Sequence, residues 1–443
     1  MANIKTTRWN QLNNQAQTQL LQRPLTSTDD QLTATVKQII EQVKSDGDKA
    51  LTDFAQRFDK VKLDTLLLNQ ATLERLAADL PDKVKQAIDC AYQQIFCFHQ
   101  QQQSEDLQVE TTKGVLCELR QRPIESIGLY IPGGTAPLPS TVLMLGIPAQ
   151  IANNPRRVLC TPPDAQGQIN PAIAYAALKC DINQVYLAGG AQAVAAMAYG
   201  TETISQVDKI FGPGNRFVTM AKQLVSNANQ CVAIDMPAGP SEVLVIADGQ
   251  ANPAFIAADL LSQAEHGPDS QVLLVSDSEA LIEQVNIVIN QQLAALPRQS
   301  IASEALKNGS FILTDSQAQS IEVTNAYAPE HLIVQNENAS EIVDQFTNAS
   351  SIFVGAWSPE SAGDYASGTN HVLPTYGYSK VLSSLSLADF CKRFTVQTLT
   401  AQGLSSISDA IMDLAQAEGL QAHSNAVAVR MASLASTPTK KGE

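Results

Sequence analysis

Four of the five histidines in this 443-residue chain stand in short polar clusters beside Gly, Pro, Asp or Glu. Imidazole is the usual side chain for metal ligation and for proton transfer near neutral pH. A chain that is poor in histidine and places it beside carboxylates at segment ends is therefore expected to build a site. The fifth histidine, His99, is expected to be an ordinary residue on a helix face. The four clusters are residues 263–268, 327–331, 363–371 and 418–423.

Gln263 and His266 are three residues apart near the end of a helix predicted over 253–266, a spacing that puts both on one face. Asp364 and His423 could complete a zinc ligand set of two nitrogens and two oxygens. Taken alone, each histidine fits a capping or hydrogen-bonding role as well as a ligand role. The amide of Gln263 is the weakest member of the set on chemical grounds.

Glu330 and His331 directly precede a strand predicted over 332–335. A neighbouring acid and imidazole at a strand edge could supply two proton-transfer groups. The alternative is a surface turn with two solvated polar groups, in which Pro329 fixes the backbone.

Glycine-rich turns follow three predicted strands, and a predicted helix follows each turn. They are Pro132-Gly133-Gly134, Gly189-Gly190 and Gly212-Pro213-Gly214-Asn215. Such turns place backbone N–H groups at helix N-termini, where a phosphate or pyrophosphate could bind. However, the chain has no Gly-x-Gly-x-x-Gly motif with a later acidic residue, and glycine at these turns also serves turn geometry alone.

The elements around these residues have an α/β pattern. Short apolar runs alternate with helical segments from residue 126 onward, which predicts mostly parallel sheets with helices on both faces. A second set of runs begins at residue 242, so we expect two α/β domains joined near 235–240. The predicted strands are 127–131, 157–160, 184–187 and 208–211, then 242–246, 271–275, 311–314, 332–335 and 351–354, with helices over 138–151, 172–180 and 191–199 in the first set.

Both ends of the chain are expected to be helical. Residues 1–106 carry two apolar stripes at helical spacing, and the tail after about Pro374 carries a third. The tail is too short for its own core and should dock elsewhere, in cis or in trans. The stripes are Val36, Ile39, Ile40 and Val43 after the polar start 27–30; Val84, Ile88, Ala91, Ile95 and Phe98; and Ile411, Leu414 and Val427.

Composition excludes several classes of protein. The net charge is −15, which argues against nucleic acid and anionic membrane surfaces as partners. No apolar run is long enough to cross a bilayer, and the N-terminus lacks a signal-peptide core, so a cytoplasmic location is expected. The seven cysteines form no Cys-x-x-Cys pair, so neither a zinc knuckle nor a redox pair is indicated.

Taken together, these segments resemble the histidinol dehydrogenase family, over residues 122–423. The N-terminal helical region is compatible with it. The resemblance rests on 128–134 (GLYIPGG), 207–215 (VDKIFGPGN), 235–242 (DMPAGPSE), 261–270 (LSQAEHGPDS), 329–332 (PEHL) and 361–371 (SAGDYASGTNH).

The resemblance implies an α/β fold with two incomplete Rossmann-like domains with parallel sheets, plus helical N-terminal and C-terminal extensions. It implies four-electron oxidation of L-histidinol to L-histidine via L-histidinal with two NAD+, by a zinc-dependent homodimer. The implied domains are a helical region 1–106, an NAD-binding domain 107–237, a zinc and catalytic domain 238–377, and a tail 378–443 that reaches the partner subunit.

The resemblance also assigns roles to residues. Glu330 and His331 would form the acid–base pair. Zinc would be bound by Gln263, His266, Asp364 and His423; these four, His331, Ser241, His371 and Glu418 would contact the substrate; and NAD would contact Tyr130, Gln192 and Asn215.

Two other functions compete with this one. A zinc hydrolase or lyase acting on a small polar substrate would use the same ligands with a metal-bound water and would need no nicotinamide. A catalytically silent nucleotide-binding regulatory protein would tolerate loss of Glu330.

Overall fold

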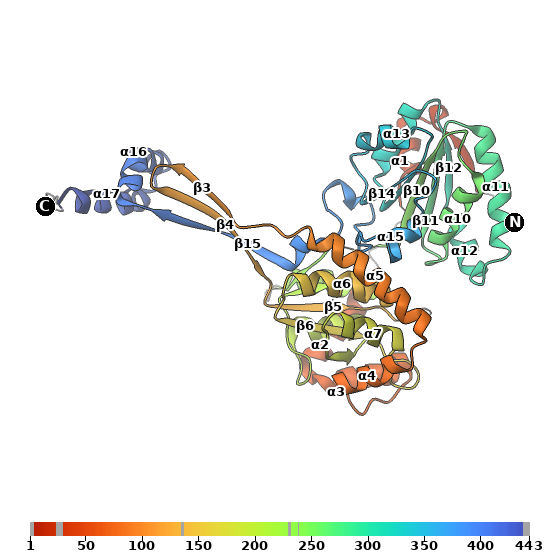
Figure 1. Ribbon diagram of the computed structural model, residues 1–443, viewed down its shortest axis with the longest axis horizontal. Coiled ribbons are helices and arrows are strands. Elements are labelled where there is room, and N and C mark those ends of the chain that lie inside the picture. The colour runs from red at the N-terminus through yellow and green to blue at the C-terminus, as the bar shows by residue number, and fades with distance from the viewer. Residues whose placement is uncertain (1–3, 24–29, 134–136, 229–231, 238, 437–443) are drawn as a thin grey trace. The chain divides into compact units, whose positions relative to one another are not determined.

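The structure, a computed structural model, describes residues 4–23, 30–133, 137–228, 232–237 and 239–436 (Figure 1). Parts of three expected features lie outside this range. They are Gly134 of the first glycine-rich turn, Ala238 of the expected domain junction, and residues 27–29 of the expected helix start. The chain divides into two compact units, one with residues 1–102 and 124–390, and the other with residues 103–123 and 391–443. The first unit contains two six-stranded sheets, and the second contains one three-stranded sheet.

The first sheet has the strand order β2-β7-β6-β5-β8-β9 and is parallel except for the antiparallel pair of β2 and β7. Its central strand, β5, is buried at every position, as expected for a parallel strand covered on both faces. The strands are β2 (Leu67–Leu68), β5 (Ser126–Tyr130), β6 (Arg156–Thr161), β7 (Val185–Leu187), β8 (Lys209–Phe211) and β9 (Ala233–Ile234).

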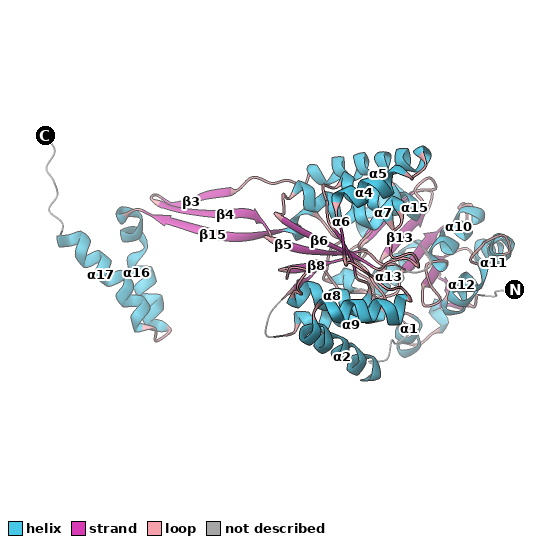
Figure 2. Cartoon of the chain, turned by 90° about the horizontal axis from the view of Figure 1, so that it is seen from below, coloured by secondary structure: helices cyan, strands magenta, loops and turns pink. Residues whose placement is uncertain are grey.

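Helices cover both faces of this sheet. Figure 2 shows α4, α5, α6 and α7 on one side and α2, α8 and α9 on the other, and the helices of each group pack against one another. The helices are α2 (Asp30–Asp46), α3 (Asp48–Phe54), α4 (Gln70–Ala78), α5 (Asp82–Gln100), α6 (Pro139–Ile151), α7 (Pro171–Lys179), α8 (Gly190–Tyr199) and α9 (Arg216–Ser226).

The second sheet has the order β1-β12-β11-β10-β13-β14, and all of its pairs are parallel. Alternate residues of β10 pack into two separate clusters, with Val243 and Val245 in one and Leu244 and Ile246 in the other. Apolar residues on both faces therefore produce the continuous apolar runs seen in the sequence. The strands are β1 (Thr6–Arg8), β10 (Glu242–Ala247), β11 (Gln271–Ser276), β12 (Ser310–Leu313), β13 (His331–Gln335) and β14 (Ser351–Val354).

Helices α10, α11 and α12 contribute to one of these clusters, and α13 and α14 contribute to the other. They fill the connections between parallel strands, as crossover helices must. The helices of this part are α1 (Asn14–Leu20), α10 (Pro253–Ala264), α11 (Glu279–Leu293), α12 (Gln299–Ala305), α13 (Gln317–Tyr327), α14 (Ala339–Ile342) and α15 (Glu360–Tyr365).

The second unit is built on an antiparallel sheet. Its central strand β4 (Val115–Pro123) pairs with β3 (Leu107–Thr112) on one side and with β15 (Cys391–Leu399) on the other. Helices α16 (Ala401–Ala417) and α17 (Gln421–Ser436) follow β15 and pack on each other.

Several expectations for the chain ends need correction. The tail was expected to be helical but contains β15, a strand that forms only by pairing with a segment more than 260 residues earlier in the sequence. The N-terminal region likewise contains β1 and β2, which lie at the edges of the two large sheets. In the second expected stripe, Val84 and Phe98 are exposed. Among the described residues, no helix combines the length and apolar character needed to cross a membrane.

Candidate active site

The Glu330-His331 pair lies at the amino end of β13, next to the start of β10. His331 is the first residue of β13 and is paired in register with Val243. Both side chains are buried, with exposed fractions of 5% for each residue. The alternative of a solvated surface turn is therefore wrong, and both groups lie where protein contacts control their protonation.

One residue of β10, Glu242, binds both members of the pair through its main chain. Its N–H donates to Glu330 Oε2 at 2.7 Å, and its carbonyl oxygen lies 3.0 Å from His331 Nδ1. Because a carbonyl oxygen only accepts, the proton of the neutral imidazole is assigned to Nδ1. Nε2 then carries the lone pair, and it has no hydrogen-bond partner among the described residues. His331 is thus oriented to accept a proton at Nε2.

Burial shifts the proton affinity of both groups. It lowers the pKa of His331 to about 3, so the imidazole is neutral at physiological pH. It raises the pKa of Glu330 well above the ordinary value, an effect that the Glu242 N–H opposes and that the charges of Glu242 and Asp364 reinforce. A neutral imidazole beside a carboxyl with a raised pKa is suited to acid–base catalysis.

His266, Glu360 and Asp364 form a candidate cation-binding cluster. Their ligand atoms all lie within 4.8 Å of one another, and Asp364 Oδ1 lies 3.9 Å from His331 Nε2. Helix α10, which carries Gln263, packs on α15, which carries Glu360 and Asp364. The Gln263 amide is fully buried, and neither its oxygen nor its nitrogen has a partner among the described residues. A buried amide without partners is costly, so this one is suited to binding a ligand.

The end of α10 differs from the prediction. The helix ends at Ala264, and His266 lies in the following turn, where its N–H donates to the Gln263 carbonyl at 3.2 Å. Gln263 and His266 therefore do not share a helix face. The turn nevertheless brings the His266 imidazole to Asp364.

Sequence reasoning missed two acidic residues, Glu360 and Asp259. Both carboxylate oxygens of Glu360 are buried and have no hydrogen-bond partner within the described part of the chain, and Oε1 lies 3.8 Å from His331 Nδ1. Burial raises its pKa well above the ordinary value, and burial raises the pKa of Asp259 to about 6. In the sequence, Pro359-Glu360 is typical of an ordinary helix start. The available signal was Asp259, four residues before Gln263 on one helix face.

His371 is brought to the same cluster. Its Nδ1 lies 2.9 Å from the Asp364 carbonyl oxygen, and its Nε2 lies 3.3 Å from Thr141 Oγ1 on α6. Burial lowers its pKa to about 4, so this imidazole is also neutral. His371 thus connects the second sheet's cluster to a helix of the first sheet.

His99 is not an ordinary helix-face residue. It is fully buried, its Nδ1 bonds to the Ile95 carbonyl at 2.8 Å, and its Nε2 lies 3.3 Å from Asn370 Nδ2. Asn370 also donates to the Met144 carbonyl at 2.7 Å. His99 therefore supports the segment that presents His371.

The remaining predicted residues lie in two places. Ser241 directly precedes Glu242 at the start of β10, and its carbonyl accepts from Gln271 N at 3.1 Å. Glu418 is the C-cap of α16, and His423 lies in the first turn of α17. These two belong to the second unit, so their association with the cluster remains a prediction.

A pocket of about 860 Å³ opens at the carboxyl ends of the strands of the first sheet. It is lined by all three residues that were expected to contact NAD, namely Tyr130, Gln192 and Asn215. Tyr130 Oη accepts from Gly190 N at 3.0 Å, and Asn215 caps the N-terminus of α9. Helix N-termini at the carboxyl edge of a parallel sheet are where α/β proteins bind dinucleotide pyrophosphates.

A buried ion pair shapes the Gly212–Asn215 turn of this pocket. Lys222 Nζ donates to the Gly212 carbonyl at 2.8 Å, and Gly212 N donates to Asp235 Oδ2 at 2.8 Å. Lys222 and Asp235 also pair directly. Gly212 has a φ of 125°, and a Cβ there would overlap the Tyr130 carbonyl oxygen, so only glycine fits this turn.

Comparison with known proteins matches this arrangement to one family. The family model described as "Histidinol dehydrogenase" matches residues 21–431. The chain is 57% identical over 423 residues to the histidinol dehydrogenase of Colwellia psychrerythraea, covering 96% of this chain and 98% of that protein. It is 53% identical to that of Vibrio cholerae, covering 97% and 99%. The chain belongs to the histidinol dehydrogenase family.

A solved structure agrees with this result. The crystal structure of histidinol dehydrogenase from Elizabethkingia anophelis is 49% identical, has a TM-score of 0.94, and covers 98% of this chain and 99% of that chain. The α/β fold with two mainly parallel sheets is therefore the fold of the family, as the sequence predicted. Family membership makes the chain an NAD- and zinc-dependent oxidoreductase of the final steps of histidine biosynthesis.

Proposed function

We propose that this chain oxidises L-histidinol to L-histidine through L-histidinal, and that Glu330 and His331 carry out the proton transfers. The observation that carries this proposal is the buried His331, whose Nδ1 is bound to the Glu242 carbonyl and whose Nε2 has no partner among the described residues. Each hydride passes to one NAD+, so two NAD+ are consumed per histidinol.

The residues of the first unit fit a zinc ion. Imidazole and carboxylate oxygen are ordinary zinc ligands, and the buried amide of Gln263, which has no hydrogen-bond partner among the residues described, provides a further oxygen. Gln263, His266 and Asp364 would bind the ion together with His423. When bound, zinc would orient the substrate by accepting its imidazole and amine nitrogens.

The first oxidation needs a base at the hydroxyl group. His331 Nε2 accepts the hydroxyl proton as the hydride leaves the adjacent carbon. The lowered pKa keeps the imidazole neutral, and the Glu242 carbonyl fixes the ring, so the lone pair is available at a defined position.

The second oxidation needs a hydrated aldehyde. Glu330, in its ionised form, removes a proton from the attacking water, and its raised pKa makes it a stronger base than an ordinary carboxylate. As the water adds, the protonated His331 returns its proton to the carbonyl oxygen of the aldehyde. The neutral imidazole then removes a hydroxyl proton of the hydrate as the second hydride leaves. The buried setting keeps the aldehyde away from solvent amines.

The remaining residues would bind the two ligands. NAD would occupy the pocket with Tyr130, Gln192 and Asn215, at the N-termini of α8 and α9. Ser241, His371 and Glu418 would contact histidinol. The division into an NAD-binding domain, 107–237, and a zinc and catalytic domain, 238–377, stays a prediction, as does the cytoplasmic location.

We further propose a homodimer with shared active sites, in which the tail supplies Glu418 and His423 to the partner subunit. Support comes from apolar side chains on α16, on α17 and in the turn between them that are exposed in the single chain, namely Leu414, Leu420, Val429 and Leu434. Surface of this kind on a two-helix extension is typical of an interaction face.

The test is the NADH stoichiometry per histidinol. Two NADH per histidinol, with histidine as product, are expected. One NADH would mean that the reaction stops at the aldehyde, and none, with histidinol consumed, would favour the zinc hydrolase or lyase.

A further inference from the structure

A partly buried arginine of the N-terminal segment, Arg23, binds two segments that contact or precede the proposed acid–base pair. Arg23 donates from Nε and Nη2 to the two carboxylate oxygens of Glu242, at 3.0 and 2.8 Å. The side chains are 13% and 1% exposed. Such a two-point contact fixes orientation as well as charge, which a lysine cannot do.

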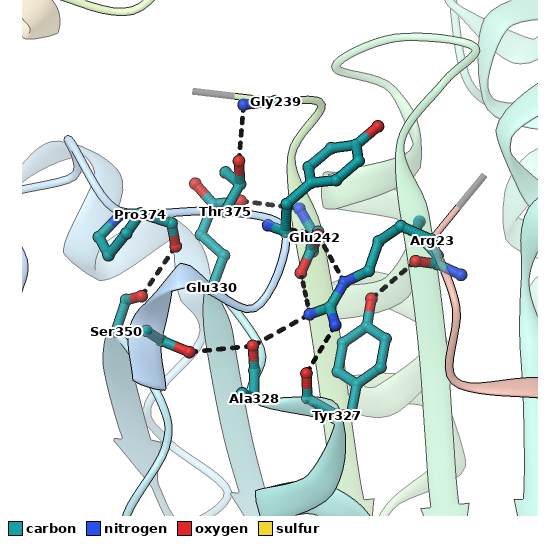
Figure 3. Close-up of polar contacts among 12 residues, drawn as sticks. Arg23, Gly239, Glu242, Tyr327, Ala328, Glu330, Ser350, Pro374 and Thr375 are labelled. Carbon is teal, nitrogen blue, oxygen red and sulfur yellow. Dashed lines mark hydrogen bonds and ion pairs between the residues drawn. The ribbon is translucent and has the colours of Figure 1, made fainter. Parts of the chain in front are cut away.

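The same guanidinium also binds the chain just before Glu330. Nη1 donates to the Tyr327 carbonyl at 2.7 Å, and Nη2 donates to the Ala328 carbonyl at 3.0 Å (Figure 3). The guanidinium carbon lies 3.7 Å from the centre of the Tyr327 ring. Arg23 therefore bridges the start of β10 and the segment that enters β13.

These two segments position both proton-transfer groups. The main chain of Glu242 binds Glu330 and His331, and Ala328 stands two residues before Glu330. Ala328 has a φ of 57°, a left-handed conformation that side-chain-bearing residues seldom adopt. Its carbonyl accepts from Arg23 and from Ser379 Oγ, at 3.0 Å in each case. These two side chains, which come from other segments of the chain, stabilise the left-handed conformation of the turn.

We infer that Arg23 is a positioning residue for the reaction: by bridging the Glu242 carboxylate and the Tyr327 and Ala328 carbonyls, it sets the geometry of Glu330 and His331. The inference rests on the catalytic roles proposed above. Among the residues that the structure describes, the hydrogen bonds of Arg23 reach none of those proposed to contact zinc, histidinol or NAD, so its effect belongs to the chemical steps rather than to binding.

The first test compares Arg23→Lys and Arg23→Gln with the parent enzyme. Both variants should lose kcat by on the order of 10- to 100-fold with histidinol and with histidinal, because small displacements of catalytic groups are costly. The KM for histidinol and the zinc content should stay within about threefold of the parent, since the ligand residues are untouched. Lysine should not rescue kcat, because an ammonium group cannot bridge all four oxygens.

The second test asks whether Arg23 acts through Glu242. Glu242→Gln keeps the side-chain shape and the main-chain contacts to Glu330 and His331, and should lower kcat with an unchanged KM. The Arg23→Gln/Glu242→Gln double variant should lose less than the product of the single losses. A fully multiplicative loss would overturn the inference. Melting and zinc content show whether the Arg23 variants fold. If they do not fold, Glu242→Gln alone is the test, and a parental kcat in Glu242→Gln would reject the inference.

Arg8→Ala is the matched control. Arg8 belongs to the same N-terminal segment, and its exposed ion pair with Glu279 joins that segment to α11. The kcat of Arg8→Ala should match that of the parent enzyme. A loss equal to that of Arg23→Lys would show that activity depends on how the whole N-terminal segment packs, not on Arg23 itself.

Glu330→Gln and His331→Asn distinguish a failure of the proposed function from a failure of the role of Arg23. Parental activity in these two variants would reject the proposed function. Inactive catalytic variants together with parental kcat in folded Arg23→Lys and Arg23→Gln would reject only the role of Arg23.

Discussion

His331 is oriented by a contact on one ring nitrogen and is free to react at the other. The Glu242 carbonyl accepts the proton of Nδ1, and Nε2 has no hydrogen-bond partner among the described residues. A histidine on a surface turn would sample both tautomers and would be partly charged near neutral pH. At this residue, burial and one main-chain acceptor together define which nitrogen can act as the base.

Glu330 is predicted to matter most for the aldehyde step. Glu330→Gln keeps an oxygen that can accept from Glu242 N–H, but an amide cannot take a proton from water. We expect oxidation of histidinal to slow by on the order of 10² to 10⁴, and oxidation of histidinol to slow less. Supplying the two substrates separately measures each step, and equal losses on both would contradict the role assigned to Glu330.

Zinc binding is predicted to depend on pH through Asp364. Burial raises the pKa of this carboxyl to about 6 in the metal-free protein, and a metal ligand must be deprotonated. Below pH 6, zinc must displace a proton, so the contribution of Asp364 should weaken affinity by up to about tenfold per pH unit. Above pH 6 this contribution should vanish.

Zinc titrations of chelator-treated protein between pH 5 and 7.5 measure this effect, with Asp364→Asn as the control that should lack it. The same treatment should abolish activity, and added zinc should restore it. Full activity in a preparation shown by elemental analysis to be metal-free would reject the metal requirement.

At the scale of elements, the two candidate sites use opposite ends of their sheets. The pocket proposed for NAD lies at the carboxyl ends, where Tyr130 ends β5 and Thr161 ends β6. The acid–base pair lies at the amino ends, where Glu242 begins β10 and His331 begins β13. The general rule for open α/β sheets, which places ligands at carboxyl ends, therefore describes only the first of the two sheets.

The turn between β8 and α9 is predicted to control NAD binding. Gly212→Ala would place a methyl group on the Tyr130 carbonyl and force a side chain into a φ of 125°. We expect the KM for NAD to rise by about tenfold or more, since strain of this kind is worth about 1–3 kcal/mol. Gly249→Ala is the control, because its nearest contact would be the Ser278 side chain at 3.2 Å. An unchanged KM in Gly212→Ala would exclude this turn from the NAD site.

At the scale of the whole molecule, the second unit buries few apolar side chains and so has only a small hydrophobic core of its own. Its sheet pairs three strands, β3 is exposed at every position, and few residues of α16 and α17 are buried. Ile411, Leu414 and Val427 were expected to dock elsewhere; Val427 is buried, whereas Leu414 is 65% exposed in the single chain. A partner subunit would cover such residues.

Complementation tests the shared site. His266→Ala and His423→Ala homodimers should both be nearly inactive, because each lacks a proposed zinc ligand. When the two are refolded together, one site of a mixed dimer carries both lesions, and the other takes intact His266 from one chain and intact His423 from its partner. We expect NADH production to recover, with each variant refolded alone as the control. No recovery despite proven heterodimers would place all ligands within one subunit.

The sequence by itself determined the elements and most of the candidate residues. Every predicted strand of the two large sheets is confirmed to within about two residues at each end, because strands buried on both faces read as continuous apolar runs between turn residues. The family followed from local motifs. The turns at Gly189-Gly190 and Gly212-Pro213-Gly214-Asn215 were also located correctly, because glycine at a positive φ is a local requirement.

Only the tertiary structure decided which residues meet. In the sequence, Glu360 is typical of a helix start and nothing distinguishes Arg23. Distant segments bury Glu360 beside His331 and bring Arg23 to Glu242. The proton position on His331 depends on a carbonyl 89 residues away, and β15 exists only because it pairs with β4. Contacts between residues so far apart in the sequence produce no periodic pattern of residue types. They depend on the packing of whole elements rather than on neighbouring residues.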